Sequence, residues 1–472
     1  MLKHFPYLHI HLVGIKGVAM TSLAQILIDA GYQITGSDLP ESFVTDEQLT
    51  KLDLAIQHGF ENKLPEQTEA VVYTAAHGGS YNPQVQEARA KGIPAFSQAE
   101  ALSFFFNSKQ GIAVCGVGGK STVSAMISWI IESNKRHPSF SVGVGNIIGL
   151  DRTGAWRPNG HQFVAEADEY VTDPISVQNG NSGIPRFSYL NPKVIVATSI
   201  SFDHPDVYKN LQHTIDTFSG FFSKLTIDDT LVLTEQVLES GVRLPTSNKV
   251  IVGTSGAADY RYELVNAHSK AGTTVARLHT TQQTYTVTLK LPGEYNIQNA
   301  VCAIAACSAI GVSNSKSIAA LKDFRSTSRR FEQKQEFQGV TFYDDYAHHP
   351  RELTAVIQAL KNWYPSNPTI IVFQPHTFSR TKALLNDFAQ SLSTAEQLIL
   401  LDIFPSARES IDPTISSTDL ARAIEQLNPH LSVPVLATVP ELAHYLKTKV
   451  RPGTIVLTAG AGDVYSVYDL LR

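Results

Sequence analysis

The first hundred residues alternate between apolar runs and amphipathic segments. An apolar run over 8–13 predicts a strand, and the apolar residues over 23–30 recur at the spacing of a helix. A second strand-like run over 70–74 is followed by a helical pattern over 83–91. This β-α alternation is typical of a doubly wound parallel sheet, so we expect a Rossmann-like domain over residues 1–108.

The alternation begins again near residue 112. Strand-like runs are expected over 112–115, 163–166 and 194–198. Apolar residues over 123–131 lie on one helical face, whereas 249–289 alternates polar with β-branched residues, as antiparallel strands do. We therefore expect a central domain over 109–325, with a parallel sheet and an antiparallel flank.

The last third of the chain predicts another α/β domain. A helical pattern over 298–310 leads into the polar stretch 313–328, which indicates a boundary near Ser326. Buried-type strands are then expected over 370–373, 398–401 and 454–458. Helical patterns separate them, so a second Rossmann-like domain is expected over 326–472.

Composition agrees with three domains and narrows the class of protein. The 472 residues are 43% hydrophobic and 17% charged, without an apolar run long enough to span a membrane. The net charge of −5 and the lack of a Lys/Arg block argue against nucleic-acid or membrane-surface partners. The three cysteines show no zinc spacing and cannot form a disulfide framework, and the N-terminus lacks a secretory signal pattern. We expect a cytoplasmic protein.

A glycine-rich segment between a predicted strand and a predicted helix carries the clearest chemistry. It consists of Gly116, Val117, Gly118, Gly119, Lys120, Ser121 and Thr122. In that context backbone N–H groups hold phosphate, a lysine binds the β- and γ-phosphates of ATP, and a serine hydroxyl can bind Mg²⁺. This predicts a central sheet of the P-loop ATPase type. The alternative is a glycine-rich turn with an exposed lysine.

The spacing is shorter than that of the common GxxxxGK[ST] loop, because Val114 occupies the place of its first glycine. Shortened loops of this form resemble those of the Mur ligases and of their folylpolyglutamate synthase relatives. Further motifs resemble Mur ligases in the order of that family: Gly14-Ile15-Lys16-Gly17-Val18-Ala19-Met20, Glu166-Ala167-Asp168-Glu169, Asp203-His204, Pro292 to Ala300, Arg329-Arg330-Phe331-Glu332 and Asp344 to Pro350.

The resemblance implies roles in binding ATP and Mg²⁺. Ser121 and Glu166 would bind one Mg²⁺ and His204 a second, while Lys120 and Arg330 would counter phosphoryl charge. Asn296 and Asn299 would meet the adenine and Asp345 the ribose side of the nucleotide. Without the resemblance, the asparagines are equally well helix caps, and Arg330 and Asp345 a surface ion pair. Glu166 and Asp168 would then form a solvated acidic turn, and His204 would be a histidine at a strand end. Ser201 stands where the family usually has a carboxylate.

The resemblance also implies the other two substrates. Gly14, Gly17, Val18, Ala19, Met20, Ser37 and Asp38 would bind the UDP-sugar, and Tyr346, His348, His376 and Arg380 would surround the amino acid. The segments Phe373 to Thr381 and Leu401 to Glu409 resemble those of ligases that join L-alanine to UDP-N-acetylmuramate in peptidoglycan precursor synthesis, by way of an acyl phosphate. Thr377 replaces an arginine common in these ligases.

Three alternatives remain open. A muropeptide-recycling ligase would add an L-alanyl peptide to UDP-N-acetylmuramate, and Tyr170 and Phe202 lean towards it. A folylpolyglutamate synthase-like ligase would lack the first 108 residues. A non-catalytic nucleotide-binding protein is suggested by Ser201 and Thr377.

Overall fold

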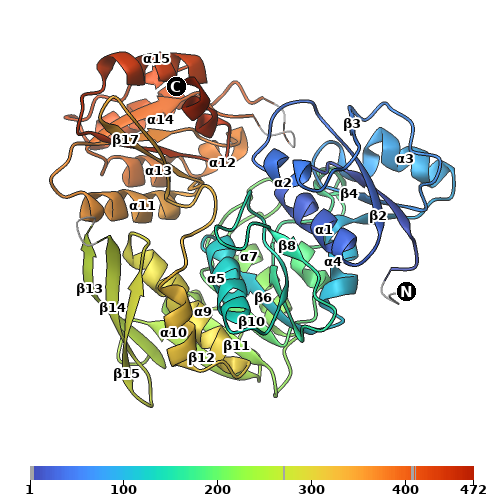
Figure 1. Ribbon diagram of the computed structural model, residues 1–472. Coiled ribbons are helices and arrows are strands. Elements are labelled where there is room, and N and C mark those ends of the chain that lie inside the picture. Colours follow the sequence, from blue (N-terminus) through green and yellow to red (C-terminus); the bar gives the residue numbers. More distant parts are fainter. Residues whose placement is uncertain (1–4, 269–271, 406–408, 410, 472) are drawn as a thin grey trace. The chain divides into compact units, whose positions relative to one another are not determined.

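The computed structural model describes residues 5–268, 272–405, 409 and 411–471. Its strands form three sheets, each within an α/β domain, as the labels in Figure 1 show. Two compact units contain these sheets: residues 1–263, 277–287 and 298–328 make the first, and 264–276, 288–297 and 329–472 the second. The three-domain α/β architecture expected from the sequence is confirmed, whereas its boundaries at 108/109 and 325/326 remain predictions.

The N-terminal sheet has the strand order β3-β2-β1-β4-β5, and all of its neighbours pair in parallel. Its elements are β1 (His9–Val13), α1 (Val18–Asp29), β2 (Gln33–Asp38), α2 (Asp46–Thr50), β3 (Ile56–His58), β4 (Ala70–Tyr73), α3 (Pro83–Ala90), β5 (Ala95–Ser97) and α4 (Gln98–Phe106). The strand order reverses between β1 and β4. In open α/β sheets such a switch point forms a crevice for ligands beyond the carboxyl ends of the strands.

The central sheet has ten strands in the order β15-β14-β13-β12-β11-β10-β6-β9-β7-β8. The strands are β6 (Gln110–Cys115), β7 (Ser139–Ser141), β8 (Gly154–Ala155), β9 (Gln162–Glu166), β10 (Val194–Ala197), β11 (Thr230–Thr234), β12 (Asn248–Gly253), β13 (Tyr260–His268), β14 (Thr273–His279) and β15 (Thr284–Leu289). The helices are α5 (Lys120–Ser133), α6 (Pro174–Gln178), α7 (Leu211–Phe222), α8 (Glu235–Glu239), α9 (Glu294–Ala309) and α10 (Asn314–Leu321). Strand β6 lies between β10 and β9, so the strand order of this sheet also reverses at β6. The glycine-rich loop follows directly after that strand.

One expectation for the central sheet was wrong in part. Antiparallel strands were expected from residue 249 onwards, but β12 pairs in parallel with β11, and β13 pairs in parallel with β12. The helix α8 between β11 and β12 makes the crossover that a parallel pair needs. Exposure falls along β12: Asn248 and Lys249 are exposed, whereas Val252 and Gly253 are buried.

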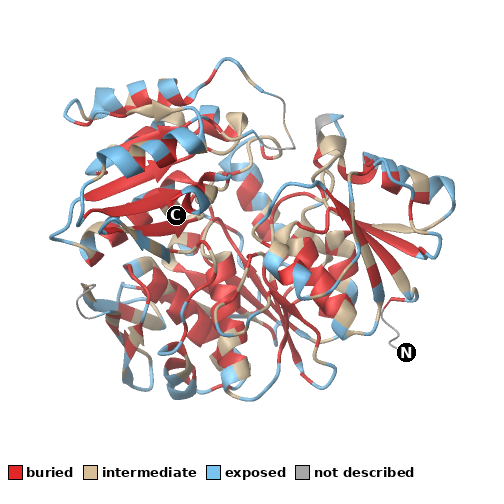
Figure 2. Ribbon diagram, turned by 45° about the horizontal axis from the view of Figure 1, so that its top comes forward, coloured by how far each residue is buried: buried red, intermediate tan, exposed pale blue. Residues whose placement is uncertain are grey.

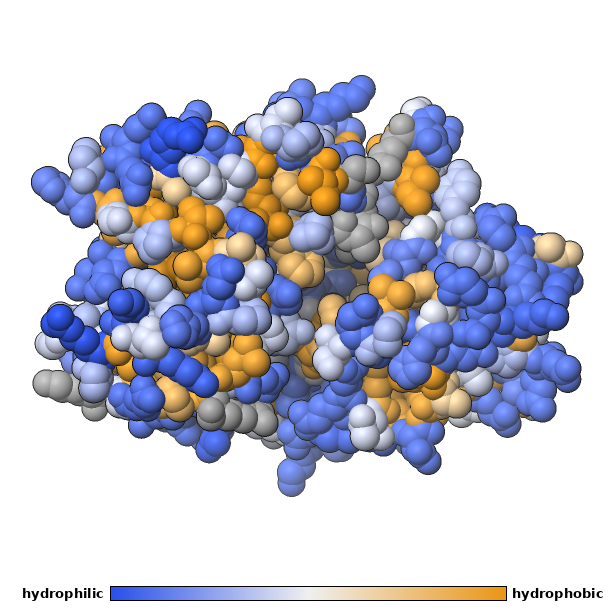
Figure 3. All heavy atoms as spheres, turned by 90° about the horizontal axis from the view of Figure 1, so that it is seen from above, coloured by the Kyte–Doolittle hydropathy of each residue, from blue (hydrophilic) through white to orange (hydrophobic). Residues whose placement is uncertain are grey.

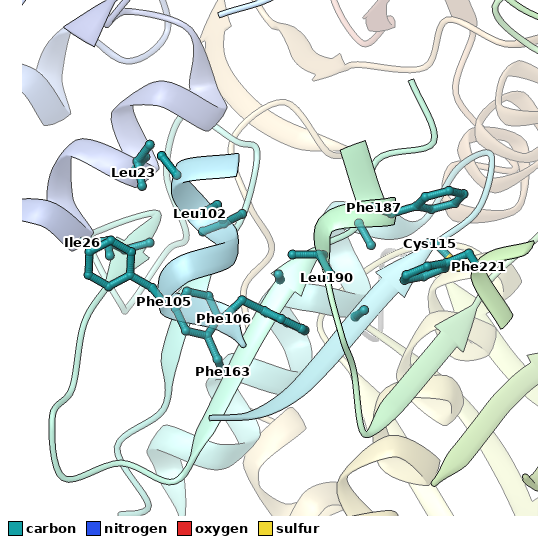
Figure 4. Close-up of a cluster of buried hydrophobic side chains, with 14 of the residues drawn as sticks. Leu23, Ile26, Leu102, Phe105, Phe106, Cys115, Phe163, Phe187, Leu190 and Phe221 are labelled. Carbon is teal, nitrogen blue, oxygen red and sulfur yellow. The ribbon is translucent and has the colours of Figure 1, made fainter. Parts of the chain in front are cut away.

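The N-terminal and central domains share one hydrophobic core. Figure 4 shows Leu23 and Ile26 of α1, with Phe105 of α4, in the same cluster as Phe163 of β9 and Phe187. Polar contacts reinforce this junction: Gln25 Oε1 accepts hydrogen bonds from the backbone N–H groups of Thr153 and Gly154, at 3.0 and 2.7 Å. Helix α1, which begins at the turn after β1, is thereby held against the central domain.

The C-terminal sheet has the order β16-β17-β21-β18-β19-β20. Among its described residues, β16 and β17 pair antiparallel and the other neighbours pair in parallel. Its elements are β16 (Glu332–Phe337), β17 (Val340–Asp345), α11 (Pro350–Trp363), β18 (Thr369–Phe373), α12 (Phe378–Ala383), α13 (Leu385–Leu392), β19 (Gln397–Leu401), α14 (Ser417–Leu427), β20 (Val435–Leu436), α15 (Val439–Lys449), β21 (Ile455–Ala459) and α16 (Val467–Leu470). The ends of β17 and β18 lie at the same edge of this sheet, with β21 between them.

The degree of burial differs between the strands of the sheets and the helices that cover them. The strands are mostly buried, while the C-terminal helices expose one side, as Figure 2 shows. On the face drawn in Figure 3, hydrophobic residues are interspersed with hydrophilic ones. Within the described ranges, none of the helices is long and apolar enough to cross a membrane.

Candidate functional site

The glycine-rich loop between β6 and α5 has a backbone that only glycine adopts easily. Gly116, Gly118 and Gly119 have φ values of +124°, +93° and +81°. A Cβ atom on Gly116 would lie 2.4 Å from Thr198 Oγ1, and one on Gly119 would lie 2.7 Å from Asn299 Oδ1. The loop is therefore closely enclosed, and it leads into the N-terminus of α5, where backbone N–H groups attract an anion. Val117 lies within it, and Thr122 lies in the first turn of the helix.

Lys120 begins α5 and is held by a carboxylate from the end of β9. Its Nζ donates to Glu169 Oε1 and Oε2 at 3.0 and 2.9 Å, and the Glu169 side chain is only 2% exposed. Burial raises the pKa of the Glu169 carboxyl group to about 7, although Lys120 opposes this rise. Burial alone would lower the pKa of Lys120, but Glu169, Asp168 and Glu166 raise it above its usual range. The lysine thus stays charged and faces the loop.

Glu166 ends β9 beside the same loop. Its Oε1 accepts a hydrogen bond from Ser121 Oγ at 3.0 Å, and its Oε2 accepts one from the backbone N–H of Gly143 at 2.9 Å. A hydroxyl and a carboxylate are the hard oxygen ligands that Mg²⁺ prefers beside a nucleotide. The pair Ser121 and Glu166 is therefore suited to that ion.

His204 lies with a different set of carboxylates. Ligand atoms of Asp168, Glu169 and His204 all lie within 4.8 Å of one another. The His204 backbone has a φ of +56°, and its ring centroid lies 4.6 Å from that of Tyr170. Arg186 Nη1 donates to Asp168 Oδ2 at 2.6 Å. The structure thus places Ser121 with Glu166, and His204 with Asp168 and Glu169.

The turn after β1 is equally constrained. Gly14 has a φ of +80°, and a Cβ atom there would lie 2.4 Å from Thr74 Cγ2. Gly17 is the N-cap residue of α1, and Val18, Ala19 and Met20 form its first turn. Asp38 Oδ2 accepts a hydrogen bond from the Lys16 backbone N–H at 2.7 Å, which ties β2 to this turn.

This turn lies close to Glu166. A Cβ atom on Gly143 would lie 3.2 Å from Glu166 Oε2 and 3.7 Å from Val18 Cγ2. Gly143 therefore lies between Glu166 and the first turn of α1, and there is room for little more than this one residue between them. A substrate bound at the turn after β1 can extend towards Ser121 and Glu166, the two oxygen donors suited to magnesium.

Ser37 belongs to a buried polar network beneath the turn. Its Oγ donates to Gln84 Oε1 at 2.5 Å, and His11 contacts Thr35 Oγ1 through Nδ1 at 2.8 Å. His11 Nε2 lies 3.3 Å from both Ser37 Oγ and Gln84 Oε1. Burial lowers the pKa of His11 to about 4, although Gln84 and Glu87 oppose this shift.

Because the folded-state pKa of His11 lies below its unfolded value, its contribution to stability is complete above about pH 6.5 and is lost as pH falls towards 4. The maximum loss is about 3 kcal/mol. We expect the urea midpoint of the wild-type protein to fall more steeply from pH 7 to pH 5 than that of His11→Gln. His58→Gln, an exposed histidine in the same sheet, serves as the control. Equal slopes for wild type and His11→Gln would contradict the prediction.

The two asparagines at the start of α9 have separate surroundings. Asn296 is buried, and its Nδ2 donates to the carbonyl of Pro292 at 2.8 Å. Asn299 is buried beside Gly119 of the phosphate loop. Asn296 therefore stabilises the turn before the helix, and Asn299 lies within contact distance of the loop.

Arg330, Tyr346 and His348 form a cluster at the end of β17. The Arg330 guanidinium carbon lies 5.2 Å from the Tyr346 ring centroid, and the rings of Tyr346 and His348 are 5.3 Å apart, edge to face. Glu352 Oε1 lies 3.7 Å from Arg330 Nη1. The arginine predicted to act on phosphate and the histidine predicted to act on the amino acid are therefore neighbours.

Asp345 is buried beside this cluster. Its carboxylate accepts hydrogen bonds from the backbone N–H groups of Phe331 and Ala347, at 2.8 and 2.7 Å. Burial raises the pKa of Asp345 to about 6, although Arg330 and the two N–H groups oppose this. Asp345 therefore fixes the backbone directly after Arg330 and directly after Tyr346.

His376 and Arg380 lie beyond the end of β18. Arg380 Nη1 lies 3.4 Å from His376 Nδ1, and the His376 ring stacks on Phe404 at 5.9 Å. Since β17 and β18 both flank β21, the pair His376 and Arg380 shares one sheet edge with Tyr346 and His348. Of the segment from Leu401 to Glu409, residues 406–408 lie outside the described residues.

Thr377 has an unusual backbone conformation, with φ +72° and ψ +137°. A β-branched residue is strained there by about 1–3 kcal/mol. We expect Thr377→Gly to raise stability by about 1 kcal/mol, because relief of strain outweighs the greater freedom of glycine in the unfolded chain.

The matched control is Thr438→Gly. Thr438 is also a helix N-cap whose side chain accepts a backbone hydrogen bond at 3.3 Å, but its φ is −137°. We expect this variant to lose stability, as measured by urea denaturation. If both variants lose stability to the same extent, Thr377 is not strained.

Sequence reasoning missed several groups at these sites. The motif that contains Asp168 and Glu169 does not indicate that they lie beside His204 and Lys120, and no motif contains Arg186, which pairs with Asp168. Glu352 follows His349 at the spacing of a capping box, a signal that was present in the sequence. No local pattern indicates which distant side chain each of them meets.

The comparisons with known proteins place the chain in a family. It matches the Mur ligase family catalytic domain over residues 9–110, the Mur ligase middle domain over 114–307, and the glutamate ligase domain of Mur ligases over 329–462. The chain belongs to the Mur ligase family.

Individual relatives extend over the full length. A UDP-N-acetylmuramate--L-alanine ligase of Desulfitobacterium hafniense is 34% identical over 465 residues, which cover 98% of each chain. One of Lachnospira eligens is 34% identical over 472 residues, again covering 98% of each.

Solved structures show the same fold. The UDP-N-acetylmuramate-alanine ligase of Thermotoga maritima superposes with a TM-score of 0.77 at 23% identity, covering 98% of both chains. A murein peptide ligase of Psychrobacter arcticus gives a TM-score of 0.70 at 22% identity, with the same coverage.

Proposed function

We propose that this protein is an ATP-dependent ligase that forms the amide bond between UDP-N-acetylmuramate and L-alanine. The full-length similarity to ligases of that name supports the substrates. The observation that carries the chemistry is the junction at Gly143, where the turn after β1 comes close to Glu166 and the phosphate loop. A carboxylate held at the first site can thereby reach a phosphate held at the second.

The reaction proceeds in two steps. The substrate carboxylate attacks the γ-phosphorus of ATP, the bond from this phosphorus to the bridging oxygen breaks, and ADP leaves. The amine of L-alanine then attacks the acyl phosphate, loses a proton, and inorganic phosphate departs from the tetrahedral intermediate. No nucleophile from the protein is needed, because the substrate carboxylate performs the attack.

The residues of the chain orient the reactants and counter charge. We propose that Lys120 leaves Glu169 for the β- and γ-phosphates, and that Arg330 counters phosphoryl charge. Asn296 and Asn299 would meet adenine and Asp345 the ribose, while the turn from Gly14 to Met20, with Ser37 and Asp38, would hold the UDP-sugar. His348, His376, Tyr346 and Arg380 would surround L-alanine, with Arg380 pairing its carboxylate.

Magnesium is the cofactor that fits the donor set. Ser121 and Glu166 would hold one ion beside the nucleotide, and His204 would hold a second. Bound there, Mg²⁺ would neutralise the charge that accumulates on the transferred phosphoryl group. Since ATP and UDP-sugars are the substrates, the proposal also implies a cytoplasmic location.

Phosphate release from purified protein tests the proposal. The assay contains ATP, MgCl₂ and UDP-N-acetylmuramate, with L-alanine, glycine, L-serine or an L-alanyl tripeptide as the acceptor. We expect L-alanine to give the highest kcat/KM. Release with the tripeptide alone would assign the recycling reaction instead, and no release with any acceptor would favour a non-catalytic protein.

A further inference from the structure

Glu352 lies at the third position of α11 and contacts two parts of the C-terminal site at once. Its Oε2 accepts hydrogen bonds from the backbone N–H groups of His348 and His349, at 3.1 and 3.3 Å. The same oxygen lies 3.4 Å from His348 Nδ1, while Oε1 lies 3.7 Å from Arg330 Nη1. The carboxylate is only 14% exposed, so these charges interact with little screening by water.

We infer that Glu352 is a positioning residue that fixes the side chains of His348 and Arg330 relative to each other. Binding of the amino-acid acceptor and transfer of the phosphoryl group then both depend on this one carboxylate. This inference rests on the proposed function, in which these two residues serve different substrates. Glu352 lies two residues beyond the motif Asp344 to Pro350, so the resemblance assigns it no role.

Capping of α11 does not account for the contacts of Glu352. In the capping boxes of α4 and α14, the carboxylates of Glu100 and Asp419 accept from the backbone N–H and the hydroxyl of the N-cap serine. Glu352 serves its N-cap residue in the same way through the His349 N–H. In addition, it reaches two side chains of the site, and these contacts contribute nothing to a cap.

The contacts also fix which nitrogen of His348 carries the proton. His348 Nδ1 lies 3.0 Å from the carbonyl oxygen of Tyr346 as well as 3.4 Å from Glu352 Oε2. Both partners are acceptors, so Nδ1 carries a hydrogen and the neutral ring has its lone pair on Nε2. The Tyr346 carbonyl therefore fixes the tautomer, and Glu352 holds the ring from a second side.

Arg330 is oriented by the same carboxylate and by an aromatic ring. The guanidinium lies over Tyr346, whose ring in turn packs edge to face against His348. A planar guanidinium held between a carboxylate and a ring loses little further freedom when it binds phosphate. Neutralising Glu352 would release the arginine and the histidine together.

Steady-state kinetics of Glu352→Gln test the inference. Glutamine retains the cap, because Glu and Gln both serve at this position, but it removes the charge. We expect the KM for L-alanine to rise about tenfold or more, as for loss of a hydrogen bond to a charged group, with kcat reduced and the KM for UDP-N-acetylmuramate unchanged. Glu352→Asp is expected to regain part of the affinity. In the double variant with His348→Ala, the KM for L-alanine should equal that of His348→Ala alone.

Asp419→Asn is the matched control, since it makes the same acid-to-amide change in a capping box of the same domain. It is expected to keep wild-type kinetics and to match Glu352→Gln in melting temperature within a few degrees. Suppose that the wild-type protein turns over L-alanine. If Glu352→Gln then leaves the KM for L-alanine unchanged, or if the effects of Glu352→Gln and His348→Ala on this KM add up in the double variant, the inference is wrong but the proposed function stands. If wild-type protein shows no turnover with L-alanine, the proposed function fails and the inference with it.

Discussion

Lys120→Ala is expected to lower turnover by at least about 10²–10³-fold, the usual effect of removing one group that stabilises developing charge in an acyl or phosphoryl transfer. The lysine is the cation at the mouth of the phosphate loop, and Glu169 holds it there by two hydrogen bonds. Phosphate release with saturating substrates measures the loss. Turnover near that of the wild type would rule out the assignment of this loop to ATP.

The same substitution leaves Glu169 buried without its ammonium partner. Breaking a buried ion pair usually costs about 3–5 kcal/mol, but the cost is smaller here because the Glu169 carboxyl group, with its pKa of about 7, can take up a proton. The control is therefore the double variant Lys120→Ala/Glu169→Gln. It should regain stability in urea denaturation but not activity, which separates the catalytic effect from misfolding.

Arg329→Ala is expected to destabilise the C-terminal domain by about 3–5 kcal/mol, because it leaves a buried carboxylate unpaired. Arg329 Nε donates to Asp344 at 2.8 Å, and its other nitrogens donate to the carbonyls of Gly460 and Gly462, at 2.7 and 3.2 Å. Asp344 has no exposed surface. Urea denaturation monitored by limited proteolysis of the C-terminal domain measures the loss.

Arg422→Ala provides the comparison within the same domain. Arg422 pairs with Asp419 on the surface of α14 and is 65% exposed, so its loss should cost less than about 1 kcal/mol. If Arg329→Ala costs no more than Arg422→Ala, the buried network does not stabilise the domain. Both arginines lie near the Tyr346 ring, but only Arg329 pairs with the buried Asp344, whereas Arg330 lies beside Glu352.

These two arginines show how far the sequence could be interpreted. The pair Arg329-Arg330 was recognised as a motif, and the resemblance assigned a function to the second residue. The network around Arg329 joins β17 to the loop after β21, more than a hundred residues along the chain. When the hydrogen-bond partners of a side chain are this far away along the chain, the residues next to it do not reveal them.

The candidate metal ligands show the same limit. The resemblance implies one magnesium ion at Ser121 and Glu166 and a second at His204, and only the structure shows that Asp168 and Glu169 lie beside that histidine. The ends of β9 and β10 lie on opposite sides of β6, so the path of each loop decides which carboxylate the histidine meets. Spacing along the chain does not contain that information.

By itself the sequence determined the features that depend on neighbouring residues. Strand and helix periodicity predicted three α/β domains, and the glycines of the segment 116–119 predicted a tight turn suited to phosphate. The structure confirms the domains and the tight turn, in which positive φ values and close neighbours exclude side chains at Gly116 and Gly119. Only the tertiary structure decided the hydrophobic core shared by the first two domains, the Glu169 partner of Lys120 and the double contact of Glu352. The physical reason is that backbone conformation is set locally, whereas the partner of a buried charge is set by sheet order and packing.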